Sequence, residues 1–152
     1  MDGLRAFAAI LSALHLIALA IGAPAIVLRS RALKGPMDDA HVARATTADN
    51  FWGVAGLLWI ATGLMRAFGG FEKGASWYLH NPLFLAKLGL VALLLLLEIH
   101  PAVTLVRWRL ARMRGETPDT SKARTLCVIS QVQVAIVGVL VFVAAAMARW
   151  SG

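Results

Sequence analysis

The stretch HNPLFLAKLGLVALLLLLEIHP, residues 80–101, decides the fold, because it is a nearly continuous apolar run. A helix needs about 20 mainly apolar residues to cross a hydrocarbon core of about 30 Å. The apolar run extends to Val106, and Asn81 followed by Pro82 supplies a helix N-cap and a first-turn proline. We therefore expect a membrane-spanning helix over residues 82–106.

The composition of the whole chain supports the same class of protein. Of the 152 residues, 59% are hydrophobic, and the mean hydropathy is +0.73. Soluble domains are only about 45–50% apolar. Three further runs are long enough to span a membrane, so we expect helices over residues 6–28, 50–69, 82–106 and 126–147. Together they form one all-α domain over residues 1–152, an integral membrane four-helix bundle with up-down topology.

The net charge of +7 is concentrated in two loops. Basic loops face the cytoplasm in multi-pass proteins, so this pattern predicts that both termini lie outside, in the inner membrane of a bacterium. We interpret the basic residues as contacts for anionic lipid headgroups rather than for nucleic acid. The loops carry Arg29, Arg31, Lys34 and Arg44 after the first span, and Arg107, Arg109, Arg112, Arg114, Lys122 and Arg124 after the third.

The loop after the first span also contains signals for a helix start. Asp38 and Asp39 are residues of the kind that cap helices, and no helix breaker follows them, so the second helix can begin before the membrane. We expect His41 to be solvent-exposed and inert. The single cysteine, Cys127, excludes an internal disulfide.

Small residues recur at helical spacing on the second span. Gly53, Gly56 and Gly63 share one face, which lets a neighbouring helix approach closely. Such a face serves either the interior of the bundle or contact with a second copy or another membrane protein.

Polar side chains inside the spans are the candidates for function. At 1.5 Å per residue, Lys87 lies about 7 Å inside the outer boundary and Arg66 lies at a similar depth, whereas His15 is near the midplane. Glu98 shares a helix face with Lys87, about 16 Å away along the axis, too far for a direct pair. Glu98 is either protonated or bonded to Gln131 at a comparable depth.

These polar groups have two interpretations. In the first, Lys87 and Arg66 extend to the outer headgroups and His15 donates one hydrogen bond, so all roles are structural. In the second, Arg66 and Lys87 bind carboxylates while an imidazole nitrogen of His15 binds a metal. Haem b or another porphyrin has this shape, a flat apolar ring with propionates at one edge. His80 and His100 lie at other depths, so the iron would be five-coordinate or use an unusual second ligand.

The run TGLMRAFGGFEKGASWYLHNPLFLAKLGL resembles a family of small bacterial predicted membrane proteins with four helices and no assigned activity. The resemblance spans most of the chain and implies a fold but no chemistry. The matching residues are Gly63, Arg66, Lys73, Gly74, Tyr78, Asn81, Pro82, Phe84, Lys87 and Pro101.

A more remote resemblance is to the HemJ-type protoporphyrinogen oxidases and the CopD-like copper-resistance membrane proteins. His15 in ALHLIAL and Lys87 in AKLGLVALLLL match a first-helix histidine and a lysine that opens a leucine-rich helix. The histidine-rich pair that often follows that lysine is replaced here by Glu98 and His100. This resemblance implies a role with porphyrin or haem.

Two functional hypotheses follow. The first is a membrane redox protein that binds haem b or a porphyrin, with His15 as metal ligand, Arg66 and Lys87 as cofactor-binding residues, and Lys87 and Glu98 as candidate catalytic residues. In this hypothesis Glu98 carries protons toward the cytoplasm. The second is a non-enzymatic membrane protein, structural or assisting a partner, with no cofactor.

Overall fold

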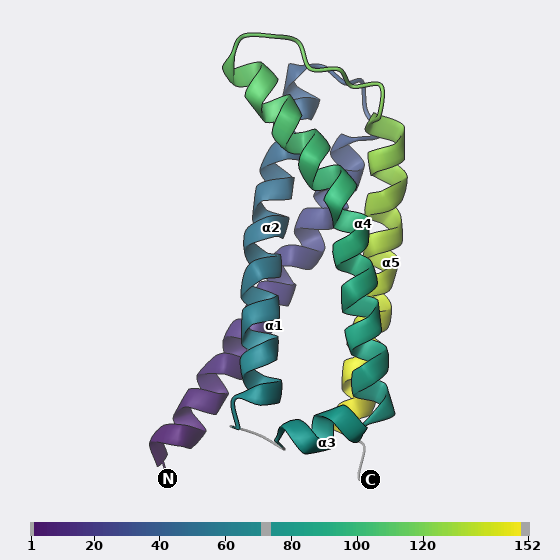
Figure 1. The fold of residues 1–152 in the computed structure, drawn as a ribbon. Helices are drawn as coiled ribbons and strands as arrows, with labels where there is room; N and C mark the ends of the chain where they lie inside the picture. The colour runs from purple at the N-terminus through teal and green to yellow at the C-terminus, as the bar shows by residue number, and fades with distance from the viewer. Residues whose placement is uncertain (1, 71–73, 150–152) are drawn as a thin grey trace.

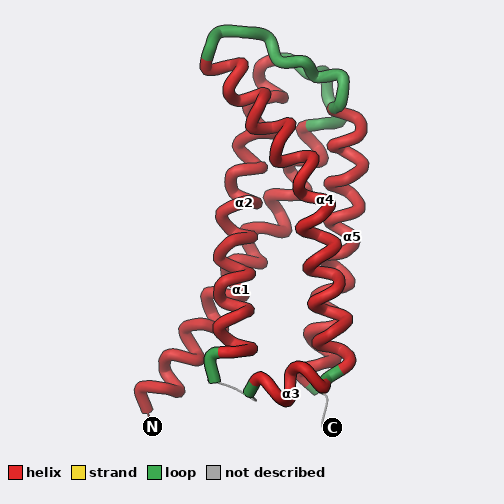
Figure 2. The backbone as a smooth tube through the Cα atoms, in the orientation of Figure 1, coloured by secondary structure: helices red, strands yellow, loops and turns green. Residues whose placement is uncertain are grey.

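The computed structural model describes residues 2–70 and 74–149, and every regular element in these residues is a helix (Figures 1 and 2). The elements are α1 (Asp2–Ala32), α2 (Asp39–Phe68), α3 (Ala75–His80), α4 (Pro82–Met113) and α5 (Ala123–Ala148). Four of the described helices, α1, α2, α4 and α5, are long and apolar enough to cross a membrane. The chain is therefore an all-α, multi-pass membrane protein, as its sequence predicts.

The four long helices pack side by side as a bundle, and successive ones run in opposite directions (Figure 1). The start of α1, the end of α5 and the short helix α3 lie at one end, here named the α3 end. The segments 33–38 and 114–122 lie at the other end, here named the loop end. Lys73, counted above among the family-matching residues, falls outside the described residues.

The long helices extend beyond the apolar runs that identify them. α1 continues to Ala32 rather than ending at 28, α2 begins at Asp39 rather than 50, and α4 continues to Met113 rather than ending at 106. The apolar run marks the hydrocarbon-crossing part of a helix, whereas the helix itself continues until capping or breaking residues stop it. At α4 the stop is Gly115, which has a φ of 73° just after the C-cap Arg114.

The predicted N-caps are present. Asn81 Oδ1 accepts hydrogen bonds from the backbone N–H groups of Leu83 and Phe84 at 2.9 and 3.2 Å, with Pro82 in the first turn. Asp38 Oδ1 accepts from the backbone N–H of His41 at 2.8 Å and contacts its Nδ1 at 2.7 Å. His41 is half-buried rather than fully exposed, and its ring contacts the capping carboxylate.

The prolines inside the spans do not end their helices. Pro24 and Pro101 lie within α1 and α4. A proline has no N–H for the carbonyl one turn back, so it bends a helix without having to stop it. Figure 1 shows α4 changing direction in its upper half.

The core consists of three layers along the bundle. Trp52, Trp59, Leu94, Ile136 and Leu140 belong to the middle layer. The layer at the loop end includes Leu105, Trp108 and Leu126, and the layer at the α3 end contains Ala67, Tyr78 and Phe84.

Candidate functional site

A cavity of about 400 Å³ lies at the α3 end and is lined by all five helices. This volume falls within the range of small-molecule sites, about 300–1,000 Å³. His15 of α1, Arg66 of α2 and Lys87 of α4 all line it, so the structure brings together the three residues that the sequence singles out as cofactor-binding. The remaining lining is mainly apolar and aromatic, from residues such as Leu16, Trp59, Trp77, Phe84 and Leu140.

His15 is buried, with 8% of its surface exposed, and Thr62 of α2 holds its ring. The His15 Nδ1 lies 2.9 Å from Thr62 Oγ1, and the same hydroxyl lies 2.7 Å from the carbonyl oxygen of Leu58. A hydroxyl has one hydrogen, and when the hydroxyl donates it to this carbonyl, Thr62 accepts the hydrogen of His15 Nδ1–H. In the neutral imidazole, Nε2 then carries the lone pair, which is the form that binds a metal.

Two further residues of α2 define the position of His15. The ring of Trp59 stacks on it with centroids 5.5 Å apart and planes inclined by 25°. A Cβ atom at Gly63 would lie 3.2 Å from His15 Cε1, tighter than ordinary van der Waals contact. Gly63 therefore serves the packing role predicted for the small-residue face, but Cβ atoms at Gly53 and Gly56 would meet nothing within 4 Å.

Trp59 also carries an unpaired hydrogen-bond donor. The indole Nε1 is buried and has no acceptor among the described residues. A buried donor without a partner costs about 1–3 kcal/mol. The ring of Trp59 lines the cavity beside His15, but its Nε1 does not reach the accessible surface of the cavity.

The short helix α3 lies across this end of the bundle (Figure 1). Its Trp77 and Tyr78 line the cavity, with their rings 5.1 Å apart, and Tyr78 in turn lies 5.0 Å from Phe84 of α4. Aromatic rings of α3 and α4 therefore form part of the cavity wall at this end. His80, on the same helix, is exposed and hydrogen-bonded to the carbonyl of Ser76 at 2.7 Å, and it does not line the cavity.

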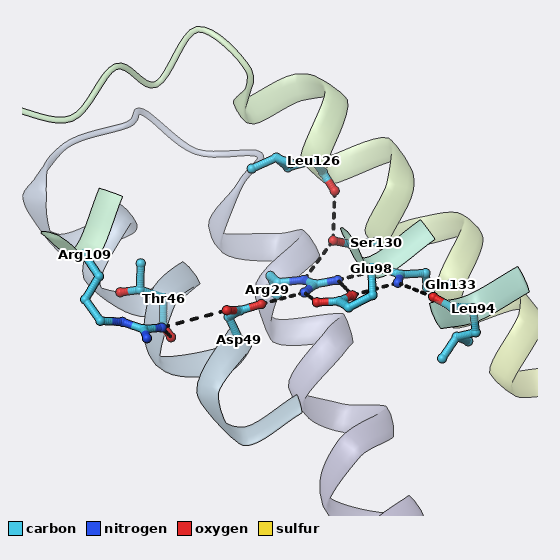
Figure 3. A network of polar contacts seen from close by, with 9 residues as sticks. All are labelled: Arg29, Thr46, Asp49, Leu94, Glu98, Arg109, Leu126, Ser130 and Gln133. Carbon is cyan, nitrogen blue, oxygen red and sulfur yellow. Dashed lines mark hydrogen bonds and ion pairs between the residues drawn. The ribbon is translucent and has the colours of Figure 1, made fainter. Parts of the chain in front are cut away.

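A second polar cluster lies nearer the loop end and is centred on Arg29 (Figure 3). Arg29 is fully buried, and each of its five N–H groups has an acceptor. Its Nε donates to Ser130 Oγ at 3.1 Å, Nη1 donates to Asp49 Oδ1 and Glu98 Oε1 at 2.7 Å each, and Nη2 donates to Glu98 Oε2 at 3.0 Å and Gln133 Oε1 at 2.6 Å. One side chain thus connects α1 to α2, α4 and α5.

The charges of this cluster balance. Arg109 Nη2 lies 3.8 Å from Asp49 Oδ2 and donates to the carbonyl of Thr46 at 3.2 Å. Two arginines therefore face two carboxylates, Asp49 and Glu98. Gln133 Nε2 completes the cluster by donating to Glu98 Oε2 at 2.7 Å. Buried charges are tolerated when they are paired and hydrogen-bonded in this way.

Two expectations are wrong at this cluster. Arg29 is not a loop residue that meets headgroups but lies inside α1. Glu98 is not bonded to Gln131, whose exposed side chain donates instead to Cys127 Sγ at 3.6 Å. Gln133, two residues further along α5, points about 200° away from Gln131 around the helix and reaches Glu98. Depth alone did not distinguish the two glutamines.

The sequence reasoning also missed Asp49, Ser130 and Gln133 as members of the cluster. Arg29 and Asp49 lie just outside the apolar runs, where Arg29 was expected in a loop and no role was expected for Asp49. The sequence does contain a signal for the pair, since Arg29 and Asp49 lie on either side of the first inter-span loop at the same expected depth. Separately, no group of three or more His, Cys, Asp or Glu side chains in the described parts of the chain is placed to hold a metal ion.

Comparison with known proteins gives a family and no activity. No curated protein and no solved structure matches the chain. The family described as "Predicted membrane protein (DUF2214)" matches residues 7–152, a range that includes both the cavity and the Arg29 cluster. Because the match covers nearly the whole sequence, the chain belongs to the DUF2214 family of predicted membrane proteins.

Proposed function

We propose that the chain is a membrane redox protein that binds haem b or a related porphyrin in the cavity at the α3 end. His15 would hold the iron, and Arg66 and Lys87 would bind the propionates. The observation that carries this proposal is that these three side chains, from three different helices, line one cavity.

The lining suits a flat apolar ring with an acidic edge. Leucines, alanines and aromatic rings line most of the cavity, and Arg66 and Lys87 supply positive charge for carboxylates. A single protein histidine suffices for haem iron, as in globins and peroxidases. When bound, haem would supply one-electron transfer within the bilayer.

The chain's own residues prepare His15 for this role. Thr62 accepts from Nδ1–H and sets the tautomer, the stacked ring of Trp59 sets the plane, and Gly63 leaves room for the imidazole. Glu98 does not line the cavity, and Arg29 and Gln133 engage its carboxylate, so the proposal gives it a structural role rather than proton transfer.

The proposal includes an orientation. The basic residues outside the spans lie mostly at the loop end, so this end faces the cytoplasm of a bacterium and meets anionic headgroups. The cavity and both chain ends then lie on the outer side of the inner membrane.

An absorption spectrum tests the haem proposal. The full chain is expressed with added haem precursor and purified in detergent, and a Soret band is expected. The band should disappear in His15→Ala and weaken in Arg66→Gln/Lys87→Gln. His100→Ala is the matched control, because His100 is exposed on α4 and does not line the cavity. A colourless wild-type preparation contradicts the proposal, as does an unchanged band in His15→Ala.

A second candidate function is a non-enzymatic protein that binds another membrane protein or a second copy of itself. The observation that favours it is the open space beside Gly53 and Gly56 of α2. Small residues on a lipid-facing helix surface allow close packing of a neighbouring helix. This candidate predicts a colourless wild-type chain whose cross-linked oligomers are lost in Gly53→Leu/Gly56→Leu.

A further inference from the structure

A groove of about 720 Å³ runs along the outside of the bundle between α1 and α5. Small residues are among those that line it, namely Ala20, Ala23 and Gly138. A Cβ atom at Gly138 would meet nothing within 4 Å, so the space there is open. The lining is apolar except at one end, where Arg31 contributes the only charged side chain among the residues that line it.

The length of the groove matches a lipid chain. The 15-residue step from Leu16 to Arg31 corresponds to about 22 Å along α1. One leaflet contributes about half of a hydrocarbon core of about 30 Å, so the groove can take a whole acyl chain and still reach the interface. It begins at the loop end, where Arg31 lies, and extends toward the α3 end.

Arg31 differs in its surroundings from Arg29, two residues earlier. Arg29 is buried and paired with carboxylates, whereas Arg31 is exposed and has no carboxylate partner among the described residues. Residues two apart point about 200° apart on a helix, so Arg31 faces away from the buried cluster and toward the groove. Arg31 lies in the last turn of α1, just beyond the end of the apolar run, which is where we expect the headgroup region of the bilayer.

We propose that this groove binds one anionic phospholipid, with the phosphate at Arg31 and an acyl chain lying along Leu28, Ala23 and Gly138 toward Leu16. A basic side chain at the end of an apolar groove between membrane helices is the arrangement that recognises anionic headgroups. A lipid that only fills space would show no preference for charge. This site is separate in its chemistry from the haem proposal and does not depend on it.

Native mass spectrometry of the full chain in mild detergent tests the site, with phosphatidylglycerol and phosphatidylcholine as the two probes. We expect one phosphatidylglycerol to be retained in preference to phosphatidylcholine. Arg31→Gln should reduce the preference about fivefold, the effect expected for one basic residue near the surface. Arg107→Gln, an exposed arginine of α4, is the charge control and should leave the preference unchanged.

The apolar part of the site is tested by filling the groove. Gly138→Leu should abolish retention of phosphatidylglycerol, whereas Gly89→Leu should not, because both glycines face open space and only Gly138 lines the groove. Circular dichroism should show equal helix content in the two variants. Retention that persists in Gly138→Leu overturns the proposal. Equal retention of the two lipids by the wild type also overturns it. A Gly138→Leu variant that changes the dimer content and not the lipid content overturns it as well.

Discussion

Glu98 of α4 forms a bidentate ion pair with Arg29 of α1, in which Oε1 lies 2.7 Å from Nη1 and Oε2 lies 3.0 Å from Nη2. The two residues are 69 positions apart in the sequence. Nη1 donates to Asp49 of α2 at the same time. Glu98, an acidic residue in a run of leucines, therefore belongs to an ion-pair cluster that joins the spans near the loop end.

The first prediction concerns the removal of Arg29. Arg29→Met leaves Asp49 and Glu98 without their shared partner, and an uncompensated buried charge costs about 3–5 kcal/mol. We expect a large fall in the thermal midpoint of the detergent-solubilised chain. Arg107→Met, which removes an exposed arginine, should change the midpoint little. Equal midpoints for the two variants would contradict a stabilising role for the Arg29 cluster.

The second prediction concerns replacement of the whole buried cluster. Arg29→Met/Asp49→Leu/Glu98→Leu leaves no buried charge without a partner, and apolar replacements of buried ion pairs are often neutral or stabilising by about 1–4 kcal/mol. Arg109 then loses Asp49, but about a third of its side chain is exposed, so water solvates it. The triple variant should recover most of the midpoint that Arg29→Met loses. A triple variant less stable than the single one would show that the cluster contributes more than charge compensation.

The sequence predicts the spans and the cavity residues better than it predicts the cluster. The prediction of a span depends on about 20 consecutive residues, so one or two polar residues within them do not change it. His15, Arg66 and Lys87 were grouped because they lie inside apolar runs, where polar residues stand out. The packing of three helices places them around one cavity. The sequence analysis grouped them by their expected depth in the membrane, without knowledge of this packing.

The cluster was missed because its members belong to different helices and to the edges of the apolar runs. Arg29 lies one residue beyond the predicted end of the first span, and Asp49 one residue before the predicted start of the second. Burial of Arg29 depends on carboxylates that are 20 and 69 residues away. This pairing cannot be predicted from a single sequence, because it depends on how the helices are aligned along one another.

The third prediction compares two glycines on one helix. An alanine is favoured over glycine inside a helix by about 1 kcal/mol. Gly56→Ala adds a Cβ in open space, so it should raise the thermal midpoint. Gly63→Ala places its Cβ 3.2 Å from His15 Cε1, so the gain should be offset by displacement of the imidazole. Equal gains in midpoint for the two variants would show that Gly63 does not limit the position of His15.

The fourth prediction concerns pH at the start of α2. The backbone N–H of His41 donates to Asp38 and, with the His41 side chain, lowers the pKa of this exposed carboxyl below its ordinary value of 3.8. A lowered carboxyl pKa means that the cap stabilises the helix above pH 3.8 and is lost as the pH falls through the folded pKa. Hydrogen exchange at the Ala40 and His41 amides should therefore accelerate, relative to the intrinsic rate, only at the acid end.

Asp38→Asn is the control for that experiment. Asparagine is also a good N-cap, but its amide does not titrate in this range. Protection in this variant should not depend on pH between 5 and the acid limit of about 2. A variant that loses protection with the same pH profile as the wild type would assign the transition to another group.

The last prediction compares two tryptophans that differ in hydrogen bonding. Trp108 Nε1 donates to the carbonyl of Asp119 at 2.8 Å, whereas Trp59 Nε1 is buried without an acceptor among the described residues. Each phenylalanine substitution removes similar ring area, but Trp108→Phe also leaves a carbonyl without its donor, and Trp59→Phe removes a donor that had no partner. Without ligand, Trp59→Phe should therefore lower the thermal midpoint less than Trp108→Phe. An equal loss of midpoint in both variants would mean that the Trp59 N–H has a hydrogen-bond partner in solution.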